Sequence, residues 1–171
     1  ADRGFDVFLT PRDLPFEGAG DALWDRASGC LWFAHGHRSV LAAGALLEQR
    51  FECEVVVLRL VDPRFYHLDT CFCPLEGGAI LYYPPAFDAA SQERIASRVP
   101  AGRRIAVSEA DALAFACNAI SVGGRVILNH AGTELAGVLG RRGLDVIRTS
   151  LSEFLKAGGS AKCLTLRLDE T

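Results

Sequence analysis

The chain has 171 residues, and its 18 Lys and Arg against 21 Asp and Glu give a formal net charge of -3. Half of the residues are hydrophobic and 23% are charged, which is typical of a folded domain with one sizeable core and excludes a disordered chain. The acidic balance, without a Lys/Arg cluster, argues against a nucleic-acid-binding surface. No apolar window reaches membrane-spanning length, so we expect no membrane contact.

The N-terminal part of the chain predicts a strand–strand–helix–strand unit. Two short strands are expected at Ala22–Asp25 and Leu31–Ala34, on either side of a turn at Ser28-Gly29. Helical spacing of apolar residues follows over Val40–Phe51, and Glu54–Leu60 is a strand rich in β-branched residues.

The same order of elements returns twice, with a period of about 45 to 50 residues. The second unit is predicted from strands Cys71–Leu75 and Ala79–Tyr83, helix Ala89–Val99 and strand Arg104–Val107. The third has strands Cys117–Val122 and Arg125–Asn129, helix Thr133–Arg142 and strand Asp145–Arg148. A fourth unit begins with Ser152–Ala157, a glycine loop and a strand at Lys162–Leu168.

A repeat of this kind indicates the architecture. A hairpin with one helix cannot close its own core, so the units must pack side by side, and a ring is one solution. No linker or low-complexity stretch divides the chain. We therefore expect a single α/β domain over residues 1–171.

Reactive side chains occur at comparable points of the units. Glu17 and Asp21 enclose small residues ahead of the first unit, His67 and Asp69 precede the second, and Cys163 follows a glycine-rich loop. In a ring these entry points converge on the axis, and a thiol, an imidazole and carboxylates are the elements of an activated thiolate site.

Each residue also has an ordinary structural interpretation. The histidine could be a satisfied structural residue, the two acids a solvated turn, and the cysteine a small core side chain. Taken singly, these interpretations are favoured. The matched placement within a repeat favours a shared functional site.

The six cysteines raise two alternatives. An even count suggests disulfides mainly in small secreted chains, so we expect free thiols and a cytoplasmic protein. Cys71, Cys73 and His67 supply three potential zinc ligands. However, the two cysteines lie in a strand-like run and the chain has no Cys-x-x-Cys pair. We therefore expect neither a metal nor another cofactor.

Three ordered motifs resemble a known family. They are Glu17-Gly18-Ala19-Gly20-Asp21, His67-Leu68-Asp69 and Gly158-Gly159-Ser160-Ala161-Lys162-Cys163. They look like the signatures of the guanidine-modifying (pentein) superfamily, which includes dimethylarginine dimethylaminohydrolases, arginine deiminases and amidinotransferases. The segment from Val61 to Pro84 and the sequence Cys117-Asn118-Ala119 are also similar to these enzymes.

The resemblance implies a five-bladed α/β propeller that is incomplete here. The chain resembles only the C-terminal portion of the family, so the N-terminal blades are expected to be absent from it. The lack of methionine agrees with a processed chain or a piece of a longer one. The ring would then need an N-terminal complement or a second copy of the chain.

The resemblance also implies roles for the catalytic residues. Cys163 is expected to attack the guanidinium carbon, and His67 to protonate the leaving amine and then activate water. Glu17 is expected to orient the imidazole. Because the acidic motif has one more small residue than in many deiminases, Asp21 remains an alternative partner of the histidine.

Substrate binding is assigned by the same resemblance. Asp69 would face the guanidinium nitrogens, Asp21 would supply a second carboxylate, and Arg38 would bind the carboxylate of an arginine-like substrate. The predicted function is hydrolysis of guanidinium C–N bonds in arginine or methylated arginine. The alternatives are an amidinotransferase and a truncated, non-catalytic module that needs a partner.

Overall fold

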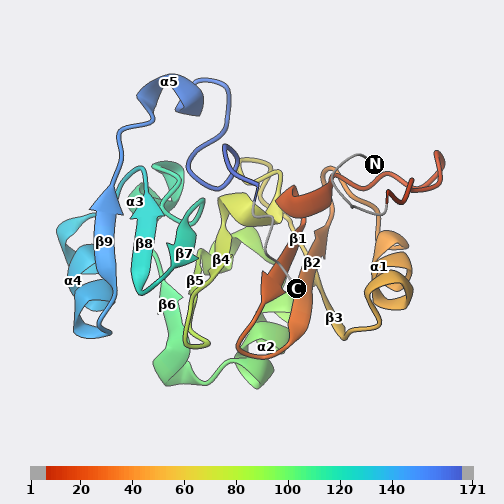
Figure 1. Ribbon diagram of the computed structural model, residues 1–171, viewed down its shortest axis with the longest axis horizontal. Coiled ribbons are helices and arrows are strands. Elements are labelled where there is room, and N and C mark those ends of the chain that lie inside the picture. The colour runs from red at the N-terminus through yellow and green to blue at the C-terminus, as the bar shows by residue number, and fades with distance from the viewer. Residues whose placement is uncertain (1–6, 167–171) are drawn as a thin grey trace.

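The computed structural model describes residues 7–166, which form three three-stranded sheets, one for each predicted unit (Figure 1). In every sheet the first two strands form an antiparallel hairpin, and the third strand pairs parallel with the second. A helix makes each crossover between the second and third strands. The α/β class and the repeat are therefore confirmed.

The strands and helices follow this repeat closely. The sheets contain β1 (Ala22–Asp25), β2 (Cys30–His35) and β3 (Val55–Arg59); β4 (Phe72–Pro74), β5 (Ile80–Tyr82) and β6 (Arg104–Ala106); and β7 (Ile120–Val122), β8 (Arg125–Leu128) and β9 (Asp145–Arg148). The crossover helices are α1 (Ala43–Phe51), α2 (Ala89–Arg98) and α4 (Thr133–Arg141), and two short helices lie outside the repeat, α3 (Glu109–Leu113) and α5 (Ser152–Leu155). None of the helices in the described part of the chain is long and apolar enough to cross a membrane.

Local sequence signals explain where the helices begin and end. The carboxylate of Asp88 caps α2 by accepting from the amide of Ser91 at 2.8 Å, a preferred N-terminal cap. After α4, Gly143 adopts a φ of +76°, and the amide of Leu144 donates to the carbonyl of Leu139. This left-handed glycine ends the helix where the sequence predicts.

Most predicted boundaries differ from the structure by one to three residues, and α3 was not predicted. Helix α1 begins at Ala43 rather than Val40, because the amide of Ala43 donates to the carbonyl of Val40 in a preceding turn. The predicted strand Lys162–Leu168 is wrong over residues 162–166. There the backbone forms local turns, with the amide of Leu164 donating to Ser160. Residues 167–168 lie outside the described part.

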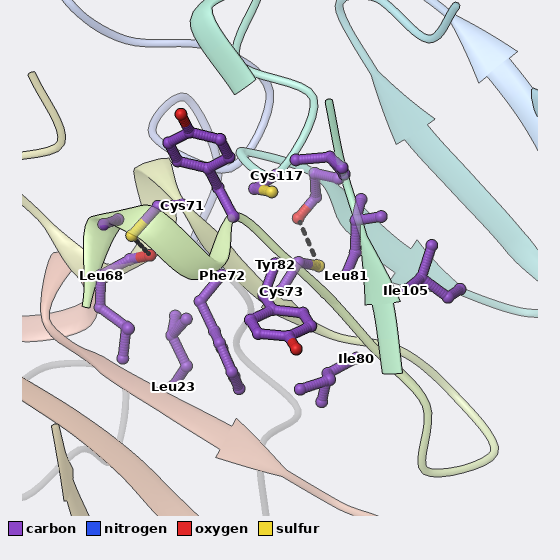
Figure 2. Close-up of a cluster of buried hydrophobic side chains, with 14 of the residues drawn as sticks. Leu23, Leu68, Cys71, Phe72, Cys73, Ile80, Leu81, Tyr82, Ile105 and Cys117 are labelled. Carbon is purple, nitrogen blue, oxygen red and sulfur yellow. Dashed lines mark hydrogen bonds between the residues drawn. The ribbon is translucent and has the colours of Figure 1, made fainter. Parts of the chain in front are cut away.

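The first strands of the three units lie side by side. β1 contacts β4, and β4 contacts β7, so the turns that precede these strands lie at the same end of the three strands, in the middle of the molecule (Figure 1). One continuous core spans all three units. Figure 2 shows Leu23 of β1 beside Phe72 of β4, and the rings of Trp32 and Phe72 have centroids 5.0 Å apart.

Four cysteines belong to this core. Cys30, Cys71, Cys73 and Cys117 are all buried, and Figure 2 shows the last three of them. The thiols of Cys71 and Cys73 donate to the carbonyls of Leu68 and Ala119, at 3.6 and 3.4 Å. Burial raises the pKa of Cys73 to about 12. Within residues 7–166, no three His, Cys, Asp or Glu side chains are grouped so as to hold a metal ion.

Candidate active site

Glu17 and His67 occupy equivalent places in the first two units. Glu17 precedes the 3-10 turn η1 (Gly18–Gly20), which leads into β1. His67 precedes the 3-10 turn η2 (Leu68–Thr70), which leads into β4. The two turns contact each other, and the Nε2 atom of His67 lies 2.6 Å from Oε2 of Glu17. Of the two acids that the sequence offers, Glu17 contacts the imidazole.

Gly20 makes this contact possible. A Cβ atom at position 20 would lie only 2.9 Å from Nδ1 of His67 and 3.0 Å from its Cγ. The imidazole therefore packs directly on the backbone of the first unit. A side chain at position 20 would have to displace the ring or the turn.

Asp69 lies inside η2 and is almost completely buried, with 3% of its surface exposed. Its Oδ2 atom accepts from the thiol of Cys163 at 3.6 Å. The other oxygen, Oδ1, has no hydrogen-bond partner within residues 7–166. Burial raises the pKa of this carboxyl to about 6, against the smaller, opposite effects of Lys162 and His67. A buried carboxylate with a free acceptor atom is suited to a cation.

Cys163 reaches the site through the glycine-rich loop. It is the exposed cysteine among the six. Partial burial of the sulfur and the neighbouring Asp69 carboxylate together raise the pKa of the thiol. Gly159 packs against it, since a Cβ at that position would lie 3.3 Å from the Cβ of Cys163. The thiol contacts Asp69 and Asn118, and the imidazole contacts Glu17.

Asn118 anchors the loop from the third unit. It is fully buried in the turn that leads into β7 (Ile120–Val122). Its Oδ1 atom accepts from the amides of Ser160 and Cys163, and its Nδ2 atom donates to the carbonyl of Asp69 and to Sγ of Cys163. These contacts join η2, the turn before β7 and the cysteine loop.

Asp21 lies elsewhere than the substrate-binding prediction places it. The side chain is 1% exposed. Oδ2 accepts from the hydroxyl of Ser39 at 2.6 Å, and Oδ1 accepts from the amide of Leu68 at 3.0 Å. Both oxygens are thus engaged in bracing the first unit against η2. Direct binding of substrate by Asp21 does not fit this placement.

Arg38 lies at the rim of the site. Its Nη1 atom is 3.5 Å from Oε1 of Glu17, and its guanidinium lies 5.2 Å from the centre of the Tyr66 ring. The Tyr66 hydroxyl donates to the carbonyl of Gly158 in the cysteine loop. Arg38 is about half exposed, so it can meet a ligand from solvent.

Sequence reasoning did not find Asn118, Tyr66 and Ser39 as site residues. One signal was available for Asn118, because it is a polar residue within the small, apolar run Ala116, Cys117 and Ala119. Tyr66 and Ser39 act through contacts between distant segments, and their local sequence gives no sign of them.

The site combines the thiol of Cys163 and the buried carboxylate of Asp69 with the imidazole of His67, which is paired with a second carboxylate. Groups of these types, placed at equivalent points of α/β repeats, define the site class of the guanidine-modifying superfamily. Over most of its length the chain is similar to members of this superfamily. It is 54% identical over 169 residues to the bifunctional arginine dihydrolase/ornithine cyclodeaminase ArgZ of Synechocystis sp., and 41% identical over 152 residues to the N(G),N(G)-dimethylarginine dimethylaminohydrolase of Mycobacterium tuberculosis. No family model matches the chain.

A solved structure agrees with these relationships. The N-terminal domain of ArgZ, covalently bound to a reaction intermediate, superposes with a TM-score of 0.95 at 55% identity, over 97% of this chain and 61% of that domain. The chain thus aligns with the N-terminal domain of this relative and not with its C-terminal portion. The alignment with ArgZ spans 99% of this chain but 24% of ArgZ, and the alignment with the Mycobacterium enzyme spans 89% of this chain and 49% of that enzyme.

Proposed function

We propose that the protein hydrolyses guanidinium C–N bonds of arginine through a covalent intermediate on Cys163. The observation that carries the proposal is the contact of Cys163 with the buried Asp69, next to the Glu17–His67 pair. Support comes from ArgZ, an arginine dihydrolase that is 54% identical over 99% of this chain.

The residues can perform the steps of such a reaction. The carboxylate of Asp69 holds the guanidinium by charge-assisted hydrogen bonds to its nitrogens. The thiolate of Cys163 forms a C–S bond with the guanidinium carbon. The C–N bond then breaks as His67 gives its proton to the departing amine. A water molecule, deprotonated by His67, attacks the same carbon, and the C–S bond breaks to return the thiolate.

The substrate itself activates the nucleophile in this scheme. In the free protein the neighbouring Asp69 carboxylate and partial burial raise the pKa of Cys163. A guanidinium seated between the two places a positive charge beside the sulfur, which favours the thiolate. Glu17 orients the imidazole that donates the proton. The thiolate therefore forms chiefly when substrate is bound.

Arg38 is the proposed partner of the substrate carboxylate. Its guanidinium is held over the Tyr66 ring, 5.2 Å from the centre, at the exposed rim of the site. An arginine-like substrate with its guanidinium on Asp69 would extend its carboxylate away from the buried end. Asp21 takes the role of a brace for η2, through Ser39 and Leu68.

We also propose that the chain forms three neighbouring blades of a five-bladed propeller. The side-by-side first strands β1, β4 and β7 support a common axis. The ArgZ domain is longer than the chain, which covers 61% of it, so further units are needed to complete the ring. An N-terminal complement is the proposed partner, with a second copy as the alternative. A cytoplasmic location fits the free thiol of Cys163.

The test is a product assay on the full-length protein. Arginine, dimethylarginine and agmatine are supplied separately, each first without and then with an acceptor amine, and products are identified by mass spectrometry. Hydrolysis of arginine with release of ammonia supports the proposal. Conversion of dimethylarginine alone favours the second candidate, a dimethylaminohydrolase, which the 41% identity to the Mycobacterium enzyme supports. Turnover only with an added amine indicates an amidinotransferase, and none indicates a non-catalytic module.

A further inference from the structure

We propose that Asn118 is a positioning residue that presents Cys163 to the substrate and stabilises its thiolate. The inference rests on the proposed function, in which Cys163 is the nucleophile. It adds a residue from the third unit to a site whose other groups come from the first two units and the cysteine loop.

The hydrogen bonds of Asn118 are complete. A carboxamide accepts at its oxygen and donates two hydrogens from its nitrogen. Oδ1 accepts from the amides of Ser160 at 3.1 Å and Cys163 at 3.2 Å. Nδ2 donates to the carbonyl of Asp69 and to Sγ of Cys163, both at 3.1 Å. The orientation is fixed chemically, because the two backbone amides can only donate and the Asp69 carbonyl can only accept.

Burial strengthens this arrangement. The side chain has no exposed surface, and a buried hydrogen bond to a charged group is stronger than one in water. A single residue thus fixes the backbone of Cys163 through Oδ1 and contacts its sulfur through Nδ2. The first contact orients the nucleophile, and the second favours its charged form.

Partial burial of the sulfur and the charged side chain beside it favour the neutral thiol. Burial and the Asp69 carboxylate raise the pKa of Cys163, and burial together with the nearby thiolate raises the pKa of Tyr66. The positive charges of Lys162 and His67 act on Asp69. The backbone amide of Ser160 and the side chain of Asn118 lower the pKa of the thiol. Asn118 is therefore the neutral side chain that offsets the repulsion from Asp69.

The decisive substitution is Asn118→Asp in the full-length protein. A carboxylate keeps both acceptor contacts to the loop amides but loses the donor to sulfur and adds a negative charge beside it. Asn129→Asp is the matched control. Asn129 also bridges distant segments of the third unit, donating to the Ala114 carbonyl and accepting from the Leu151 amide, without touching Cys163.

The readout is the rate of alkylation of Cys163 by iodoacetamide as a function of pH, measured by mass spectrometry without substrate. We expect Asn118→Asp to raise the pH midpoint by about one unit or more, so that alkylation at pH 7.5 falls roughly tenfold. Asn129→Asp should leave the midpoint unchanged. Cys53, which is partly buried, is labelled in the same samples as an internal reference.

A second variant guards against a fold defect. If Asn118→Asp does not fold, Asn118→Ala replaces it; losing the donor without adding charge should still raise the midpoint, by a smaller amount. Equal midpoints in the folded Asn118 variants and in Asn129→Asp would overturn the proposal. Because no substrate is involved, a protein that fails to hydrolyse arginine still yields this result. The alkylation experiment can therefore contradict the role of Asn118 without contradicting the proposed hydrolysis of arginine, and the product assay can do the reverse.

Discussion

At the level of single residues, Asp69 shows a conflict between binding and stability. Its carboxylate is buried and leaves Oδ1 without a hydrogen-bond partner within residues 7–166, and an unpaired buried charge opposes folding. Its pKa is raised from the ordinary 3.8 to about 6 by burial. The folded state therefore binds a proton more tightly than the unfolded state, and the stabilisation it gives at low pH is lost as pH rises through about 6.

Asp69→Asn should consequently stabilise the protein in a pH-dependent way. We expect no electrostatic gain near pH 4 and a gain of about 1–3 kcal/mol above pH 6, measured by urea unfolding. Hydrolysis should be lost, because a neutral amide does not hold a guanidinium. Asp25→Asn is the control: the Asp25 carboxylate accepts from the indole of Trp32 and two backbone amides, so that variant should lose stability. Equal stability of Asp69→Asn and the parent at pH 7.5 would contradict the argument.

The cysteines give a second prediction at this scale. Cys163→Ser should reduce turnover to below about 10⁻³ of the parent while leaving the unfolding midpoint unchanged, because Cys163 is exposed. Cys73→Ser should retain turnover but lose about 1–3 kcal/mol of stability, because its thiol lies in the core and donates to Ala119. Steady-state kinetics and thermal unfolding separate the two. Near-normal rates for Cys163→Ser would remove covalent catalysis from the proposal.

At the level of elements, the two equivalent 3-10 turns bring Glu17 and His67 together. Their contact depends on the bare backbone at Gly20, where a Cβ would lie 2.9 Å from the imidazole. Gly20→Ala should therefore displace His67 and lower kcat by about 10²-fold. Gly102→Ala is the matched control, since a Cβ there meets no atom within 4 Å. Unchanged kcat in Gly20→Ala would show that the imidazole tolerates the displacement.

The same elements show how far the sequence predicts the structure. Periodicity and turn residues predict the three units because their signals are local, as in the strand Val55–Arg59 and the glycine that ends α4. The pairing of Glu17 with His67 was expected from their equal places in the repeat, although Asp21 remained an alternative. Asn118 and Tyr66 were missed as site residues because their roles arise from contacts with a loop more than 40 positions away. The expected strand at Lys162 forms turns instead, since strand propensity needs a pairing neighbour.

At the scale of the whole molecule, the third sheet differs from the first. The first sheet is buried on both faces, with Phe33 toward α1 and Trp32 toward the main core. In the third sheet, Val126 is fully buried on one face. The opposite face carries Ile120, Ile127 and Ile147, which lie in register across β7, β8 and β9 and are only partly buried or exposed. A row of isoleucines on an open face fits a further packing partner.

In the proposed propeller, this face contacts a neighbouring unit. Ile147 is the most direct probe of that contact, because 36% of the surface of Ile147 is exposed in the described part of the chain. In the full-length protein, Ile147→Glu should lower the free energy of unfolding by about 2–4 kcal/mol, because burying an isoleucine stabilises by about 1.5–3 kcal/mol and a buried carboxylate adds a further cost.

Leu113→Glu is the control for this substitution. Leu113 is 49% exposed at the end of α3, away from the isoleucine row, and a surface substitution changes stability by about 0.5 kcal/mol or less. Urea unfolding of both variants and hydrogen exchange of the β9 amides provide the measurements. If Ile147→Glu is as mild as Leu113→Glu and the β9 amides exchange freely, no unit covers this face, and the ring is not closed at the third sheet.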